Sequence, residues 1–93
     1  MSTQTVAGND TPLGYQQITS LSASTGLTIP VGARWALIIP EVQAVRWREV
    51  GTPTATVGIP QAVGQVLLYT GNLSAIRFIE QTASATLNVA YYG

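Results

Sequence analysis

The chain has 93 residues, of which four are Arg and four are Asp or Glu, and it contains no His, Cys or Lys. These absences exclude a Ser–His–Asp triad, a Schiff-base lysine, disulfides and the usual ligands of structural zinc. Charged residues make up 9% of the sequence, whereas an ordinary domain has about 25%. A domain of this size exposes roughly 5,000 Å². Eight charged side chains cover only a small part of this area. We therefore expect either that uncharged polar groups cover the rest of the surface, or that part of the surface is buried in an assembly.

The charge balance also bears on partners. A formal net charge of zero creates no basic field that would attract nucleic acid. No apolar run approaches the roughly 20 residues of a membrane span, and Met1–Gln4 lacks the features of a signal peptide. We therefore expect no nucleic acid, no membrane and no cofactor. A domain this small gains only modest stability from its own core, which favours a homo-oligomer.

The residue types favour strands over helices. Thr, Val, Ile and Tyr are plentiful, and nine Gly and five Pro punctuate the sequence at the spacing of short strands. This pattern predicts an all-β fold, a small antiparallel β-sandwich or jelly roll of about seven or eight short strands. We assign residues 1–13 to an extended N-terminal arm and residues 14–93 to a single sandwich domain.

The first half of the domain contains several strand patterns. Tyr15–Leu21 alternates weakly, and Leu27–Ile29 is predicted to be a short strand that the following proline ends. Trp35–Ile39 is a continuous apolar run, which is typical of a strand buried on both faces. Pro40 is expected to break or bulge that strand, because proline cannot donate to a central ladder. Glu41–Glu49 then alternates again.

The next segments are shorter. Val50–Ala55 contains Gly and Pro and is predicted to be a hairpin turn or a loop. Thr56–Ile59 is predicted to be a strand that Pro60 stops, and Gln65–Thr70 is predicted to be another strand.

The C-terminal part gives the clearest signals. Gly71-Asn72 is expected to be the two-residue turn of a hairpin leading into a strand over Leu73–Glu80. Thr86–Tyr92 alternates regularly, with Leu87, Val89 and Tyr91 on one face, as a half-buried antiparallel strand requires. The adjacent tyrosines at its end point to opposite faces, so one is expected in the core and the other exposed or at an interface.

The sequence offers little for catalysis. Four carboxylates could form an acid/base pair, but they are more simply explained as surface groups or partners of arginine. No His or Lys is present to activate a serine or threonine. We therefore expect no enzyme activity.

The segment Arg46-Trp47-Arg48-Glu49 is the most distinctive cluster. On a strand, Val45 and Trp47 share one face while Arg46 and Arg48 share the other. One interpretation places Trp47 in the core, with both arginines solvated or paired with carboxylates. The other makes the cluster an interface, because Trp and Arg are enriched at interface hot spots and guanidinium tolerates desolvation better than ammonium. A contact with nucleic acid or glycan is a third, weaker interpretation.

Five residues are the candidate interface residues on these grounds. They are Arg46, Trp47, Arg48, Arg77 and Tyr92. No catalytic, metal-binding or cofactor-binding residue is predicted.

The sequence resembles small virion proteins of tailed bacteriophages over most of its length. The segments that carry this resemblance are Leu27–Ala33, Ala44–Arg48, Pro53–Gly58, Gly71–Ile79 and Ala85–Tyr92. The resemblance implies a structural component of the particle, most simply a capsid decoration (cement) protein located on the capsid surface of the virion. It implies the major capsid protein and further copies of this chain as partners, with a trimer favoured. The predicted arm would reach a neighbouring subunit.

Two alternatives remain open at this stage. One is a carbohydrate- or receptor-binding module of a phage tail or head fibre, in which exposed aromatic rings stack on a sugar. The rings considered for that role are Trp35, Trp47, Tyr69 and Tyr92. The other is a head-completion or tail-joint protein, which differs from a decoration protein only in its location.

Overall fold

The structure is a computed structural model that describes residues 10–93, and this range contains eight strands and no helix. The strands are β1 (Pro12–Ile18), β2 (Thr25–Gly26), β3 (Trp35–Glu41), β4 (Val45–Arg48), β5 (Ile59–Gln61), β6 (Leu67–Tyr69), β7 (Arg77–Glu80) and β8 (Thr86–Tyr92). The predicted all-β class is therefore confirmed.

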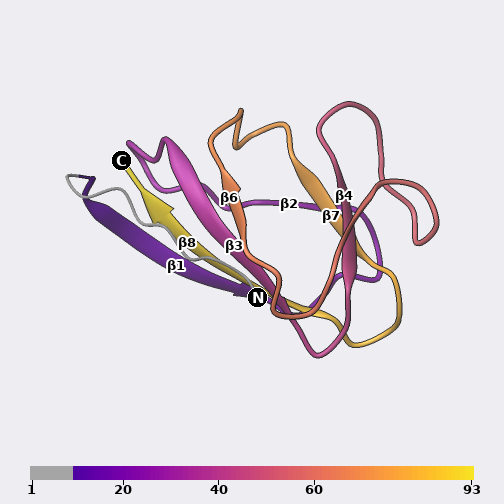
Figure 1. Cartoon of the computed structure of the whole chain (residues 1–93). Coiled ribbons are helices and arrows are strands. Elements are labelled where there is room, and N and C mark those ends of the chain that lie inside the picture. The colour runs from indigo at the N-terminus through magenta and orange to yellow at the C-terminus, as the bar shows by residue number, and fades with distance from the viewer. Residues whose placement is uncertain (1–9) are drawn as a thin grey trace.

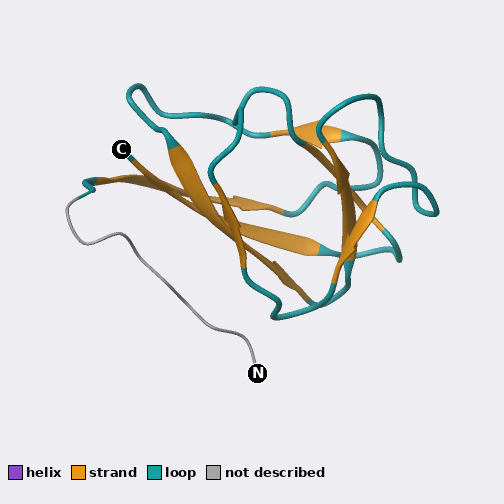
Figure 2. Ribbon diagram, turned by 45° about the horizontal axis from the view of Figure 1, so that its top comes forward, coloured by secondary structure: helices purple, strands orange, loops and turns teal. Residues whose placement is uncertain are grey.

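The strands form two antiparallel sheets of four strands each, in the orders β1-β8-β3-β6 and β2-β7-β4-β5. Figures 1 and 2 show these sheets as two layers, with the described part of the chain beginning at β1 and ending at β8 in the same layer. The pairs β1·β8, β2·β7, β3·β6 and β4·β5 are all antiparallel and alternate between the sheets. This is the connectivity of a jelly roll.

The core lies between the two sheets. In β8, Leu87, Val89 and Tyr91 are buried, while the residues between them are only half-buried and face outward. The strand and the alternation predicted for Thr86–Tyr92 are thus confirmed. From the second sheet, Val45 and Phe78 enter the same core, and each fully buried large side chain contributes about 1.5–3 kcal/mol.

Pro40 does not break strand β3, contrary to the prediction. It lies within the strand and pairs with Leu87 of β8. Its carbonyl accepts a hydrogen bond from Gly64 N at 2.9 Å, so its nitrogen faces the same side, beyond the end of β6. Because no neighbouring strand requires an N–H there, the ladder tolerates proline.

Pro60 likewise lies inside a strand. β5 spans Ile59–Gln61, whereas the sequence predicted a strand over Thr56–Ile59 that Pro60 would end. β5 is an edge strand, paired only with β4, and proline is tolerated at such an edge. The short strand predicted at Leu27–Ile29 is also wrong, because the pairing with β7 falls instead on Thr25–Gly26.

Gly71-Asn72 is not the turn of a hairpin. β6 and β7 belong to different sheets, so residues 70–76 cross from one layer to the other. The side-chain oxygen of Asn72 accepts from Ser74 N at 3.0 Å and its carbonyl accepts from Ala75 N at 3.0 Å. These bonds hold the segment in a turn, and the strand predicted over Leu73–Glu80 begins only at Arg77.

The predicted arm, residues 1–13, falls largely outside the described residues. Strand β1 already begins at Pro12, so the last two positions assigned to the arm belong to the sheet.

Candidate functional site

Three of the four arginines lie on the outer face of the sheet β2-β7-β4-β5. In β4, Val45 is fully buried and Trp47 packs against the core, so Arg46 and Arg48 point outward. In β7, Phe78 is fully buried and Arg77 is exposed. We call the surface formed by Arg46, Arg48 and Arg77 the arginine face. The alternation predicted over Glu41–Glu49 is therefore confirmed for Val45–Arg48 only, because Glu41 ends β3 and residues 42–44 belong to no strand.

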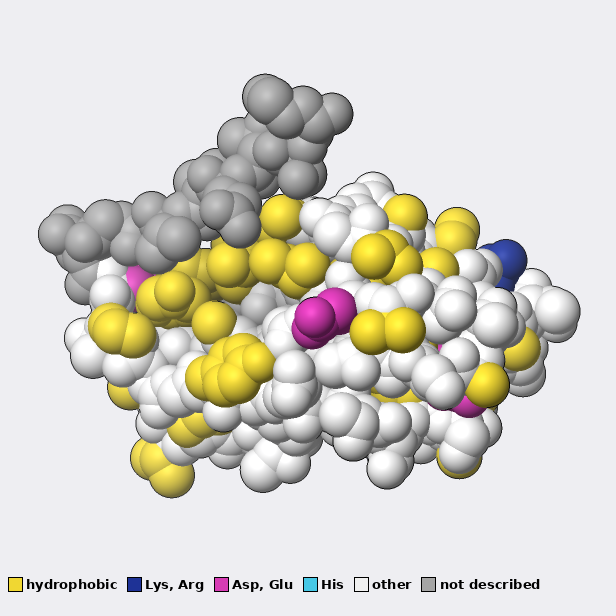
Figure 3. Space-filling view, turned by 90° about the horizontal axis from the view of Figure 1, so that it is seen from below, with side chains coloured by type: hydrophobic (Ala, Val, Ile, Leu, Met, Phe, Trp, Pro, Cys, Tyr) yellow, Lys and Arg dark blue, Asp and Glu magenta, His cyan; other side chains and the backbone are white. Residues whose placement is uncertain are grey.

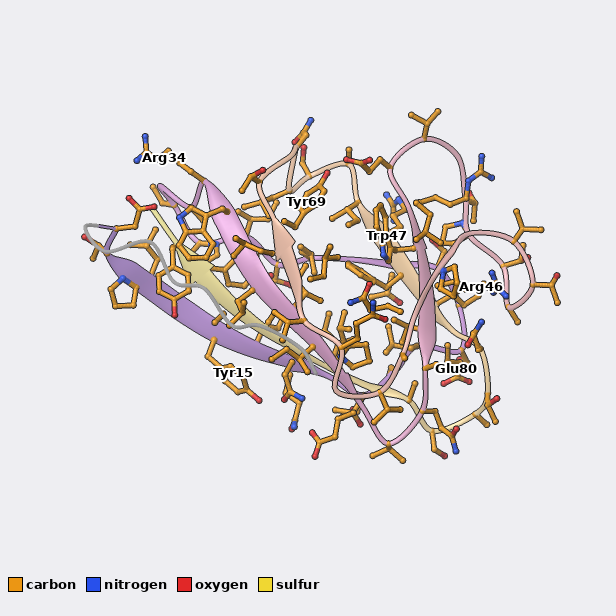
Figure 4. The ribbon with its side chains drawn as sticks, in the orientation of Figure 1. Tyr15, Arg34, Arg46, Trp47, Tyr69 and Glu80 are labelled. Carbon is orange, nitrogen blue, oxygen red and sulfur yellow. The ribbon has the colours of Figure 1, made fainter. Side chains whose placement is uncertain are left out.

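Arg46 holds the connection between β4 and β5 against the sheet. Its Nε donates to Ala55 O at 3.1 Å, and its Nη1 donates to Gly58 O at 2.8 Å. With the Gln81 amide turned so that its oxygen faces Arg46, that oxygen also accepts from Nε and Nη2 at 2.9 and 3.0 Å. We call residues 49–58 the braced loop. Figure 4 shows Arg46 at the end of the molecule opposite Arg34.

The braced loop is further ordered by its own hydrogen bonds. Thr54 and Val57 exchange two backbone hydrogen bonds of 2.8 and 3.2 Å, and the Thr54 hydroxyl accepts from Val57 N at 3.0 Å. Pro53 is buried, whereas Val50 and Val57 are 82% and 51% exposed. Apart from the exposed Glu49 at its start, the loop therefore presents uncharged, partly apolar groups from a fixed backbone.

Arg48 packs against the start of this loop. Its Nη1 lies 3.5 Å from Thr52 O. Gly51 has a φ of +84°, and a Cβ at that position would lie 3.0 Å from Arg48 Cζ. The positive φ therefore favours glycine there, and the Arg48 guanidinium would have to move by a few tenths of an ångström to admit a Cβ.

Arg48 and Arg77 are directly opposite each other in the pairing of β4 with β7. Within residues 10–93, the only ion pair joins Arg34 to Asp10, at 3.7 Å. Within the described residues, Arg46 and Arg48 are thus not paired with carboxylates, so this part of the first interpretation is wrong; Arg46 binds carbonyl groups instead. Like charges directly opposite in a sheet destabilise it, so the arginine face holds positive charge that the described part of the chain does not neutralise.

Trp47 is half-buried, packs against the core and does not reach the arginine face. Its Nε1 lies 3.4 Å from Gln61 Oε1, and its ring meets that of Tyr69 edge to face at 6.4 Å. The Tyr69 hydroxyl donates to Glu49 Oε2 at 2.6 Å. Burial, together with this carboxylate, raises the pKa of Tyr69 to about 12.

Tyr92 lies on the other sheet, away from the arginine face. Its ring stacks on that of Trp35 at 4.2 Å with an interplanar angle of 10°. The Trp35 indole N–H in turn donates to Asp10. Of the five candidate residues, the structure brings Arg46, Arg48 and Arg77 together and separates Trp47 and Tyr92 from them. As predicted, one of the adjacent tyrosines, Tyr91, is in the core.

The most exposed aromatic side chain in the described range was missed at the sequence level. Tyr15 is 65% exposed, whereas Trp35 and Tyr69, two of the rings considered for stacking on a sugar, are buried. Tyr15 lies between glycine and two glutamines, and this polar setting on a weakly alternating strand was the available signal. Figure 4 shows its side chain directed away from β1.

Within residues 10–93, no group of three or more His, Cys, Asp or Glu residues could hold a metal ion. In the same range, no helix is long and apolar enough to cross a membrane. Comparison with protein families, with curated proteins and with solved structures found no match to this chain.

Proposed function

We propose that this chain is a non-enzymatic structural protein of a virion, most simply a decoration protein that binds the lattice of major capsid subunits. One observation carries the proposal. Three of the four arginines gather on one outer face, and Arg48 and Arg77 oppose each other without a carboxylate partner in the described range. In a chain with so few charges, this arrangement suits a partner that supplies carboxylates, which bind guanidinium in a planar, bidentate geometry.

The braced loop strengthens this docking surface. Val50 and Val57 add exposed apolar area beside the arginines, and the hydrogen bonds from Arg46 fix the loop before any partner binds. Such preorganisation lowers the entropy cost of association. A modest contact of this kind suffices on a capsid, because a symmetric lattice repeats it many times.

The jelly-roll connectivity is in keeping with this role, since the fold is common among viral capsid domains. The fold alone does not define a function. Further copies of the chain, in a trimer, are the second partner that we propose.

Co-sedimentation with capsid shells from the source of the sequence tests the proposal. We expect the wild-type chain to bind the shells and to raise their resistance to heat. Arg77→Glu should weaken this binding about tenfold, as loss of an interface anchor does. Arg34→Glu is the matched control, because it makes the same charge change at the other end of the molecule and should leave binding unaltered. A wild-type chain that does not co-sediment, or equal losses for both variants, would contradict the proposal.

A further inference from the structure

The outer face of the sheet β1-β8-β3-β6 lies on the side of the sandwich away from the arginine face. Its outward side chains form rows across the strands, and these rows can be read from the pairing register. One row is apolar and consists of Tyr15, Ala90, Leu37 and Leu68. The next row consists of Gln17, Asn88 and Ile39, and Glu41 follows beyond it on β3. The face therefore changes from apolar to polar along the strands, and Figure 3 shows how few charged groups interrupt its apolar area.

Tyr15 stands at the boundary between these rows. Its cross-strand partner is the small Ala90, but its hydroxyl donates to Asn88 Oδ1 at 2.5 Å, and Asn88 lies two residues before Ala90 on β8. The ring is therefore inclined diagonally over the sheet and fixed by its own hydrogen bond. Despite this bond the side chain is 65% exposed, so a ligand can reach the ring.

A connected set of polar groups borders this ring. Gln17 Nε2 donates to Asn88 Oδ1 at 3.2 Å, and Asn88 Nδ2 donates to Glu41 Oε1 at 3.0 Å. Within residues 10–93, no hydrogen bond uses Gln17 Oε1 or Glu41 Oε2, and each of the two amide groups has a second N–H to donate. We call Tyr15, Gln17, Glu41 and Asn88 the tyrosine platform.

We propose that the tyrosine platform binds a neutral carbohydrate chain. A pyranose ring has an apolar C–H face, which suits an exposed aromatic ring, and a rim of hydroxyls that both donate and accept. The platform offers both kinds of surface side by side, with amide donors and carboxylate and amide acceptors at the edge of the ring. Glu41 is its charged member, so an anionic polymer such as nucleic acid is disfavoured by charge.

This site does not depend on the proposed function. The platform and the arginine face belong to different sheets of the sandwich. Occupation of one face therefore leaves the other accessible, and a chain bound to a shell through its arginines would present the platform outward.

Nuclear magnetic resonance of the full ¹⁵N-labelled chain tests the proposal, because the side-chain amides of Gln17 and Asn88 report directly on the platform. The probes are the neutral hexasaccharides of maltose, cellulose, mannan and xylan, each titrated to millimolar concentration. We expect at least one of them to shift both amide signals. Tyr15→Ala should weaken that binding about tenfold, and Tyr15→Phe, which keeps the ring but loses its anchor to Asn88, should weaken it less.

Val31→Ala is the matched control, because Val31 is 98% exposed in a turn outside the platform, and it should bind as the wild type does. The proposal is overturned if no hexasaccharide shifts the two amides, or if Tyr15→Ala binds as tightly as Val31→Ala. Tyr15→Ala should also leave co-sedimentation with capsid shells unchanged, so this proposal and the proposed function fail independently.

Discussion

Replacement of Arg46 by Ala should destabilise the domain through loss of the braced loop. The substitution removes the hydrogen bonds to Ala55 O and Gly58 O, of 3.1 and 2.8 Å, and the contact with Gln81. A hydrogen bond to a charged group contributes about 1.5–3 kcal/mol when it is buried. Ala55 is exposed and Gly58 is half-buried, so water replaces part of what is lost. The expected net loss is about 2 kcal/mol.

For a domain of this length, a loss of about 2 kcal/mol lowers the thermal midpoint by roughly 8–16 °C. Urea unfolding followed by tryptophan fluorescence measures the loss directly, as a midpoint lowered by about 1–2 M at constant slope. Arg46→Lys keeps the positive charge but not the planar fork, so it should recover only part of the stability.

Arg34→Ala is the matched control for the removal of an arginine. The Arg34 side chain is 74% exposed and its contact with Asp10 is 3.7 Å, so its loss should change stability by less than about 0.5 kcal/mol. If Arg46→Ala and Arg34→Ala unfold at the same urea concentration, then the bonds to the loop do not stabilise the fold and the reasoning is refuted.

Three further predictions follow from particular contacts. Arg77→Gln removes the repulsion with the opposing arginine and should stabilise the isolated chain by about 0.3 kcal/mol at low salt, a gain that should vanish in calorimetry at high salt. Gly51→Ala should cost about 1–2 kcal/mol because of its φ of +84° and the guanidinium beside it; Gly64→Ala, with a φ of +77° and nothing within 4 Å, should cost less in the same urea assay, and equal losses would contradict the role of the guanidinium. Burial raises the pKa of Tyr69 and of Tyr91 to about 12 in the folded chain, above the ordinary value of about 10. The stability that these two protonated tyrosines provide is therefore fully present below pH 10 and is lost as the pH rises through about 12. The free energy of unfolding, measured at increasing pH, should show this loss, and the loss should be smaller in Tyr69→Phe. An unchanged pH profile in Tyr69→Phe would contradict the prediction.

The strand content of the fold was predictable because it depends on local pattern. The alternation of Thr86–Tyr92 places its apolar side chains on one face whatever its neighbours are, and β8 has the predicted bounds. The strand order was not predictable, since β1 pairs with β8 across more than 70 residues of sequence, as in Gly14 opposite Tyr91. Nothing local specifies such a pairing.

The predictions that Pro40 and Pro60 would interrupt strands were wrong for the same reason, because the strand order was not known. A proline ends a strand only where a neighbouring strand requires its N–H. Pro40 lies beyond the end of β6 and Pro60 lies on an edge strand, and neither position can be recognised before the sheet order is known.

The candidate site was predictable only in part. The local period placed Arg46 and Arg48 on one side of a strand, but the presence of Arg77 beside them depends on the register of β4 with β7. The hydrogen bonds from Arg46 to the braced loop could not be predicted either, because their acceptors are backbone carbonyls, which every residue has. The tyrosine platform likewise combines side chains from β1, β3 and β8, and its members acquire a common role only through that pairing.

The two outer faces of the sandwich differ in charge. Positive charge gathers on the outer face of β2-β7-β4-β5, whereas Glu41 lies on the outer face of the opposite sheet. On and beside the sheet β2-β7-β4-β5, the three arginines outnumber the two carboxylates, Glu49 and Glu80, so an acidic surface would be attracted to the arginine face. In the binding to a capsid lattice that we propose, the arginine face would therefore meet an acidic partner, and the tyrosine platform, on the other sheet, would face away from it.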